Sequence, residues 1–295
     1  MSHLLSERGE FNLAGVLVAM TLFAGILGAT LMTFEQFQQV DRDTVDRADS
    51  QDRSRITADR LTRELRNLAS PTPDRPESVD RAQPYDVIFQ SVDPLGPNAG
   101  ANAANVMRVR YCLDDSQSNA SLWRQEQRWT TALPPAVPAD TACPGSSWPS
   151  QAAVADHLVN RRDGLDRPVF SYNGATSTTD VLSVRTDLYI DLDVLRKPRE
   201  TRIATGVHLR NQNRRPIAAF EPPKVNSSNI TLNGSLSSDP EGEAMRFLWY
   251  DGTTKVGEGI TFTYVPVSRG QRVISLKVYD PANLEGVAPA VTVTW

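Results

Sequence analysis

The sequence has little of what most enzymes and nucleic-acid-binding proteins need. Only two of its 295 residues are cysteine and three are histidine, and the histidines lack the spacing of a metal-binding motif. The sequence contains no glycine-rich phosphate loop and no serine-nucleophile motif. The formal net charge of −4 gives no basic excess for nucleic acid. We therefore expect a protein that is not an enzyme, takes no cofactor and makes no nucleic-acid contact.

One long hydrophobic run is present, and it lies near the N-terminus. Residues 11–34 contain no charged side chain and only four polar ones. As a helix they would extend about 36 Å, enough to cross the ~30 Å hydrocarbon core of a membrane. A secretory signal has a shorter apolar core and a positively charged leader, whereas MSHLLSERGE offers only Arg8 between two glutamates. A signal peptide cleaved near residues 25–29 remains the alternative.

Helical periodicity continues beyond the hydrophobic run. Leu61, Leu65 and Leu68 recur at positions i, i+4 and i+7, which places them on one helical face. Oppositely charged residues stand four apart in this stretch, as in Asp43 and Arg47, which favours a solvated helix. The sequence SPTP at residues 70–73 ends the pattern. We predict one helix over residues 10–70, with residues 11–34 in the membrane.

This N-terminus resembles that of type IV prepilins and of type II secretion minor pseudopilins of the J type. The match is carried by Arg8-Gly9, by the run LAGVLVAM at residues 13–20, and by LTRELRNLASP at the helix end. The resemblance implies that residues 1–9 are a leader, which a prepilin peptidase removes between Gly9 and Glu10, and that Glu10 is a candidate for N-methylation. It also implies partners: other pilins or pseudopilins, the inner-membrane assembly platform and membrane lipid. The residues it assigns to membrane and filament packing are Phe11, Leu13, Val16, Leu17, Met20 and Phe23.

Two positions depart from the family pattern. Glu10 stands where a hydrophobic residue usually begins the mature chain, and the usual glutamate of the apolar run is replaced at Ala14 and Gly15. In the family that carboxylate pairs with the N-terminal amine of a neighbouring subunit, which would otherwise be an unpaired buried charge. Its absence suits a minor subunit at the filament tip. Weak processing, or Glu10 acting in its place, are the alternatives.

Residues 71–213 are predicted to form an antiparallel sheet. Alternating or short apolar segments at residues 86–92, 105–112, 121–129, 180–195 and 201–213 predict strands. In the longest of them, Asp187, Asp191 and Asp193 are expected on a solvated face. A half-apolar sheet must pack against something, and the helix around Leu65 is its natural cover. If this domain is exported, Cys112 and Cys143 are candidates for one disulfide.

The C-terminal part is predicted to be a small β-sandwich, residues 223–295, after a proline-rich linker at residues 214–222. Strands are expected at residues 230–233, 245–250, 261–264, 272–279 and 291–295, with Trp249 in the core. The string SSDPEG, the segment FLW and VYD at residues 278–280 resemble an immunoglobulin-like PKD domain, which implies an extracellular spacer or adhesive module. Asp239, Glu241 and Asp280 form a candidate Ca²⁺ site, although aspartates before proline more often cap turns.

Together these patterns predict an α+β protein: a long transmembrane and amphipathic N-terminal helix on a pilin-like antiparallel sheet, followed by a small all-β immunoglobulin-like sandwich. Two functions fit. One is a minor pilin or pseudopilin that starts as a single-pass membrane protein and ends in an extracytoplasmic filament at the bacterial surface. The other is a membrane-anchored surface protein that presents the PKD-like module for adhesion or ligand binding. Secretion, adhesion, DNA uptake and motility are not distinguished by the sequence.

Overall fold

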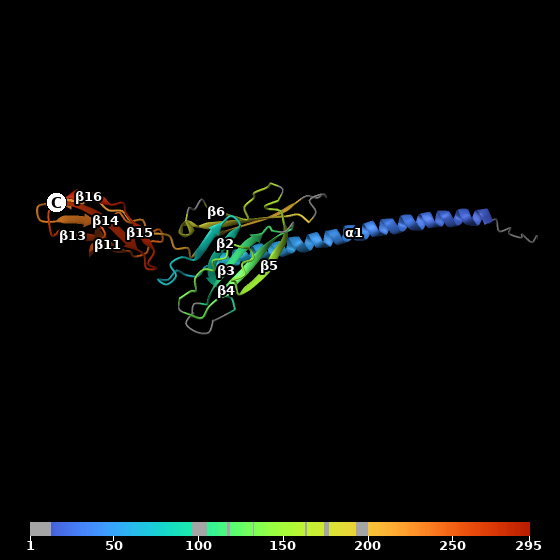
Figure 1. Cartoon of the computed structure of the whole chain (residues 1–295), viewed down its shortest axis with the longest axis horizontal. Coiled ribbons are helices and arrows are strands. Elements are labelled where there is room, and N and C mark those ends of the chain that lie inside the picture. Colours follow the sequence, from blue (N-terminus) through green and yellow to red (C-terminus); the bar gives the residue numbers. More distant parts are fainter. Residues whose placement is uncertain are drawn as a thin grey trace, which may run out of the picture. The chain divides into compact units, whose positions relative to one another are not determined.

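The computed structural model describes residues 13–95, 105–116, 119–131, 133–162, 164–173, 177–192 and 200–295. Its longest element is helix α1 (Leu13–Arg66), whose 54 residues give a length of about 80 Å (Figure 1). Arg63 and Arg66 lie in the last turn, where positive charge is favourable for the helix dipole. The chain forms two compact units, Met1–Ser50 and Gln51–Trp295.

An eight-stranded antiparallel sheet follows α1 in the second unit (Figure 1). Along the sheet the order is β1-β2-β3-β4-β5-β7-β6, and β8 also pairs with β7. The strands are β1 (Val79–Gln83), β2 (Asp86–Val92), β3 (Val106–Asp114), β4 (Ala120–Arg128), β5 (Ser150–Leu158), β6 (Phe170–Tyr172), β7 (Ser183–Ile190) and β8 (Thr201–His208). A short 3₁₀ helix, η1 (Thr178–Asp180), precedes β7.

The last part of α1 packs on one face of this sheet. Leu61, Leu65 and Leu68 are at most 1% exposed and belong to the same core as Phe89 of β2 and Val109 of β3. The prediction that the helix covers the sheet is therefore confirmed. Burial of leucine-sized side chains stabilises the fold by roughly 1.5–3 kcal/mol each.

Strands β5 and β7 meet at a single residue pair, Leu158 and Ile190, so the sheet opens between them. Helix α1 contacts both sides of this opening. The Thr57 hydroxyl donates to the Val154 carbonyl of β5 at 2.5 Å, and the Thr62 hydroxyl lies 3.1 Å from that of Thr205 on β8. Side-chain hydroxyls of the helix thus bond to β5 and to β8, the strand paired with β7.

The C-terminal segment is a two-sheet β-sandwich (Figure 1). One sheet contains β9 (Lys224–Val225), β10 (Ile230–Asn233) and β13 (Thr261–Tyr264). The other contains β11 (Arg246–Asp251), β12 (Thr254–Glu258), β14 (Gln271–Tyr279), β15 (Glu285–Val287) and β16 (Val291–Thr294). Trp249 is fully buried as predicted; its ring meets Phe220 edge to face, and its Nε1 donates to the Gly259 carbonyl at 2.9 Å.

Some sequence-based boundaries need correction. The structure begins the described helix at Leu13 and ends it at Arg66, within the predicted 10–70. Strands β1, β5, β6, β9, β12 and β15 were not predicted. Part of the predicted linker belongs to the sandwich, because Ile217 pairs with Ser238 and Phe220 packs against the sandwich core.

The prediction that Asp187 lies on a solvated face of β7 is also wrong. This carboxylate is buried because Arg185 and Arg202 both bond to it, at 2.8 and 2.7 Å. Asp191 is buried too, and Asp193 lies outside the described residues. Arginines on neighbouring positions cover this face in place of water.

We expect Leu65→Ala to lower the free energy of unfolding by about 2–5 kcal/mol, because it leaves a cavity between helix and sheet. The matched control is Ile56→Ala on the same helix, where the side chain is 64% exposed and the change should stay within about 0.5 kcal/mol. Urea unfolding of the detergent-solubilised chain, followed by tryptophan fluorescence, measures both. Equal losses for the two variants would contradict the packing described above.

Candidate functional site

The first candidate surface is the N-terminal part of α1. Helix α1 is the one helix of the described residues that is long and apolar enough to cross a membrane, and its apolar span is uncovered. Leu13, Leu17, Met20 and Phe23 are exposed and Val16 is half-buried. Gly9, Glu10 and Phe11 lie outside the described residues.

Polar groups inside the apolar span are satisfied by the helix itself. The Thr21 hydroxyl donates to the Val18 carbonyl at 2.9 Å, and the Thr30 hydroxyl to the Leu27 carbonyl at 2.8 Å. Thr33 donates to the Ala29 carbonyl. In hydrocarbon every polar group needs an internal partner, so these three threonines are compatible with a single-pass membrane helix.

The second candidate surface is the contact that fixes α1 on the sheet, and it contains buried charges. Glu64 of α1 accepts from Nε and Nη2 of Arg124 on β4, at 3.1 and 2.9 Å, and both side chains are almost fully buried. The Tyr111 hydroxyl of β3 donates to the same carboxylate at 2.8 Å. Burial next to this carboxylate raises the pKa of Tyr111 well above its ordinary value, so its hydroxyl stays protonated as a donor.

The buried ion pair continues along the sheet. Arg124 also donates to Glu126 at 2.6 Å, and Arg128 bonds to Glu126 and to Asp93. Burial alone would raise the pKa of Glu126, but the two arginines hold it below its ordinary value. Sequence reasoning missed this network. Its only signal was the charged pattern of residues 124–128 within a segment that otherwise predicts a strand.

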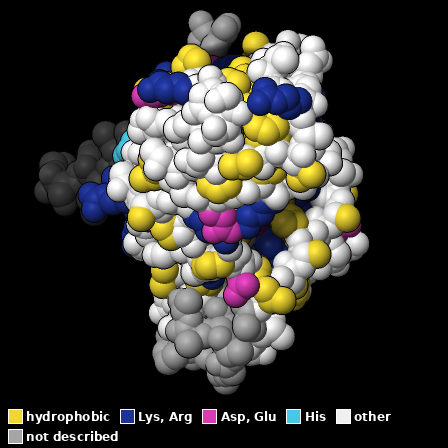
Figure 2. Space-filling model, turned by 90° about the vertical axis from the view of Figure 1, so that its left-hand side faces the viewer, with side chains coloured by type: hydrophobic (Ala, Val, Ile, Leu, Met, Phe, Trp, Pro, Cys, Tyr) yellow, Lys and Arg dark blue, Asp and Glu magenta, His cyan; other side chains and the backbone are white. Residues whose placement is uncertain are grey.

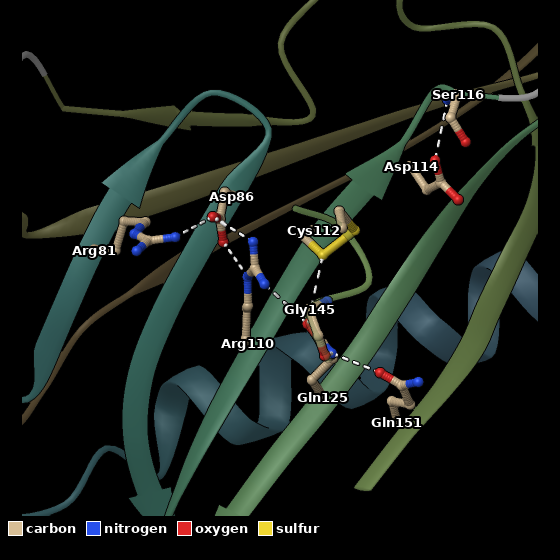
Figure 3. The surroundings of a disulfide bond; sticks show 10 residues. Arg81, Asp86, Arg110, Cys112, Asp114, Ser116, Gln125, Gly145 and Gln151 are labelled. Atoms are coloured by element: carbon tan, nitrogen blue, oxygen red, sulfur yellow. Dashed lines mark hydrogen bonds and ion pairs between the residues drawn. A yellow bond between two sulfur atoms is a disulfide. The ribbon is translucent and has the colours of Figure 1, made fainter. Parts of the chain in front are cut away.

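The opposite face of the sheet carries the disulfide (Figure 3). Cys112 of β3 is bonded to Cys143 in the loop before β5, and α1 lies on the other side of the sheet. The expected cysteine pair is thus present. It joins the loop of residues 134–149 to the sheet face formed by Arg108, Arg110 and Gln125, which are buried.

Under this loop Arg110 is completely buried. Its Nε and Nη2 donate to the two carboxylate oxygens of Asp86, each at 2.9 Å, and its Nη1 donates to Gln125 at 3.0 Å (Figure 3). The Gln125 amide then donates to the carbonyl of Gly145 at 2.8 Å. A Cβ at Gly145 would lie 2.9 Å from Arg110 Nη1, so only glycine allows this approach.

The three residues of the candidate Ca²⁺ site do not form one. Asp239 accepts from the amides of Glu241 and Glu243, and Asp280 accepts from the Leu284 amide at 2.8 Å. Glu241 bonds to Arg214 at 2.6 Å. Among the residues that the structure describes, no three His, Cys, Asp or Glu side chains are grouped so as to hold a metal ion. The carboxylates cap turns and pair with arginine, and turn capping is the alternative given above for aspartates before proline.

The solved structures that resemble part of this chain include a PKD domain. The crystal structure of the PKD1 domain of Vibrio anguillarum Epp is 23% identical over the aligned part, which is 28% of this chain and 94% of that domain, with a TM-score of 0.25. No family model matches the chain, and no curated protein matches it.

Removal of the disulfide should destabilise the fold. For the double variant Cys112→Ser/Cys143→Ser we expect a loss of about 3–4 kcal/mol, because the bond closes a loop between residues 31 apart. Urea unfolding of the variant and the oxidised parent measures the difference. The parent treated with reductant should lose a similar amount; an unchanged midpoint would show that the loop is held without the bond.

The Glu64–Arg124 contact can be tested by a double-mutant cycle. Glu64→Ala should cost about 3–5 kcal/mol, because buried Arg124 and Tyr111 lose the carboxylate to which they donate, and Arg124 keeps only its bond to Glu126. The double variant Glu64→Ala/Arg124→Ala should cost less than the sum of the single losses, since neither charge is then left unpaired. Asp59→Ala, on the exposed side of the same helix, is the control. Additive losses would contradict direct coupling.

Proposed function

We propose that this chain is a minor pilin or pseudopilin, a structural subunit at or near the tip of a type IV pilus-like or type II secretion filament. The observation that carries the proposal is the change of surroundings along one continuous helix. Residues 13–33 of α1 are apolar and uncovered, whereas Leu61 and Leu65 of the same helix are buried in the core of an antiparallel sheet.

Two further features support this function. The disulfide between Cys112 and Cys143 favours an oxidising, extracytoplasmic compartment for the sheet. The C-terminal sandwich adds a second folded layer to the exposed part, which would crowd a filament shaft and favours the tip.

In this proposal a prepilin peptidase cuts between Gly9 and Glu10, and α1 then leaves the lipid for the filament. Membrane lipid and the inner-membrane assembly platform are its first partners, and the helices of other pilins or pseudopilins are its final ones. The chain itself carries out no chemical reaction.

The second candidate is a single-pass surface protein that keeps its leader and presents the sandwich for adhesion. One observation favours it. In the loop between β13 and β14, Val265 is 62% exposed and Val267 is fully exposed. In Figure 2, however, the hydrophobic side chains on the viewed face are spread between Lys, Arg, Asp and Glu side chains and do not form one continuous patch.

The N-terminus of the mature protein distinguishes the two functions. We expect mass spectrometry of the protein from its native membranes to find Glu10 as the first residue. The variant Gly9→Glu should remain as uncut precursor, because the peptidase reads the residue before the cut. Gly15→Ala, which adds a methyl group into open space, is the matched control and should be cut normally. An intact leader in the parent protein would favour the anchored surface protein.

A further inference from the structure

From Phe34, at the end of the apolar span, one face of α1 carries a second apolar row. Phe34, Phe37, Val45 and Ala48 lie on this face, with Asp41 between them, and successive members stand three or four positions apart. All five are exposed, and Phe37 is 70% exposed. We call these five residues the Asp41 seam.

Lipid can cover Phe34, but it does not account for the rest of the Asp41 seam. A helix that enters the hydrocarbon core at Leu13 crosses it in about 20 residues. Charged residues begin at Glu35, and Val45 lies about 18 Å beyond residue 33 along the helix. An apolar row at these spacings outside lipid is the pattern of a helix that packs against another helix.

Asp41 differs from the other aspartates of this part of the helix. The five at positions 43, 46, 49, 52 and 59 each have an arginine three or four residues away, as in the pair formed by Asp52 and Arg55 at 3.7 Å. Asp41 has Phe37, Gln38, Thr44 and Val45 at those positions. The one aspartate that no arginine of the same helix can reach at this spacing therefore lies in the centre of the apolar row.

A carboxylate in a helix–helix contact needs a cation, because an unpaired buried charge is strongly unfavourable. A second copy of this chain in register would place Asp41 against Asp41, and like charges repel. A partner helix with apolar residues would cover the apolar row, and one Lys or Arg of that helix opposite Asp41 would pair with its carboxylate. A single polar residue in an apolar seam is also the best-attested way to fix partner and register.

We propose that the Asp41 seam binds an apolar helix of a different subunit, and that Asp41 forms an ion pair with a Lys or Arg of that helix. The ion pair determines which subunit binds and in which register. That this subunit is part of the same filament rests on the function proposed above, whereas the pairing chemistry does not.

Cysteine cross-linking in native membranes tests the seam. Cys112 and Cys143 are joined to each other, and no described cysteine is free, so Val45→Cys introduces one reactive thiol. The full-length variant is oxidised in membranes together with a library of single cysteines in the helices of the other subunits. We expect a disulfide to a different chain, with a Lys or Arg within one helical turn of the linked residue. Asp46→Cys, on another face of α1, should not cross-link.

The role of the charge is tested in the Val45→Cys background. Asp41→Asn should reduce the cross-linked fraction about tenfold or more, because it leaves the partner's cation unpaired. Asp46→Asn, an identical chemical change off the seam, should leave the fraction unchanged. Asp41→Lys should abolish the link, and exchange of the partner's cation for Asp should restore it. Protease resistance of the sheet domain verifies that each variant is folded.

Three results would overturn the proposal: a dominant link between two copies of this chain through Val45→Cys, equal linking from Asp46→Cys, or equal effects of Asp41→Asn and Asp46→Asn. Failure of the filament function is recognised separately, by a mature N-terminus other than Glu10. An Asp41-dependent link in a chain with an intact leader would support the proposed contact of the Asp41 seam and contradict the pilin function. Cleavage before Glu10 without such a link would support the pilin function and contradict the proposed contact.

Discussion

The ion pair between Glu64 and Arg124 fixes how the end of α1 sits on the sheet. The apolar contacts of Leu61 and Leu65 are strong but non-directional, and alone they would tolerate a helix that turns about its axis. A buried carboxylate that accepts from Arg124 and from Tyr111 permits one rotation, because any other leaves charges unpaired in the core. With this rotation fixed, the hydroxyls of Thr57 and Thr62 reach β5 and β8; the sheet opens between β5 and β7, and β8 is paired with β7.

On the other face of the sheet, a buried pair of arginine and aspartate holds a loop instead of a helix. Arg110 is buried by a loop without regular secondary structure, and its bonds to Asp86 and Gln125 give that loop a defined surface to bind. The Cys112–Cys143 bond then holds the loop on this surface. A sheet with charges buried on both faces relies on complete pairing, since a single unpaired group under the helix or the loop costs more than a surface ion pair contributes.

Patterns that depend on neighbours along the chain were predicted well, and those that depend on distant partners were not. The leucines of the helix end were placed on the buried face, strands were predicted at the positions of β3, β10 and β14, and Trp249 was placed in the core. The burial of Arg110 and Asp187 could not be predicted, because each depends on a cover supplied from elsewhere: a loop about 30 residues away, and Arg202 on the next strand. Strand β5 was missed because SQAAVADHL has weak alternation, and pairing with β4 overrides it. At the candidate site, periodicity identified the helix but not the carboxylates that anchor it.

The charged residues of α1 have two roles: most pair with each other along the helix, and Asp41 is proposed to bind a partner subunit. Most aspartates of the helix outside the apolar span stand within one turn of an arginine. Such pairs stabilise the helix weakly, and each aspartate has a counter-charge within its own helix. The apolar run, in turn, contains no acidic residue, and Ala14 and Gly15 are uncharged. On our proposal, the selective carboxylate lies outside this run, at Asp41. At that position water can solvate it before assembly, so the free chain does not bear the cost of a charge in lipid. Selection then occurs when the seam closes and removes that water.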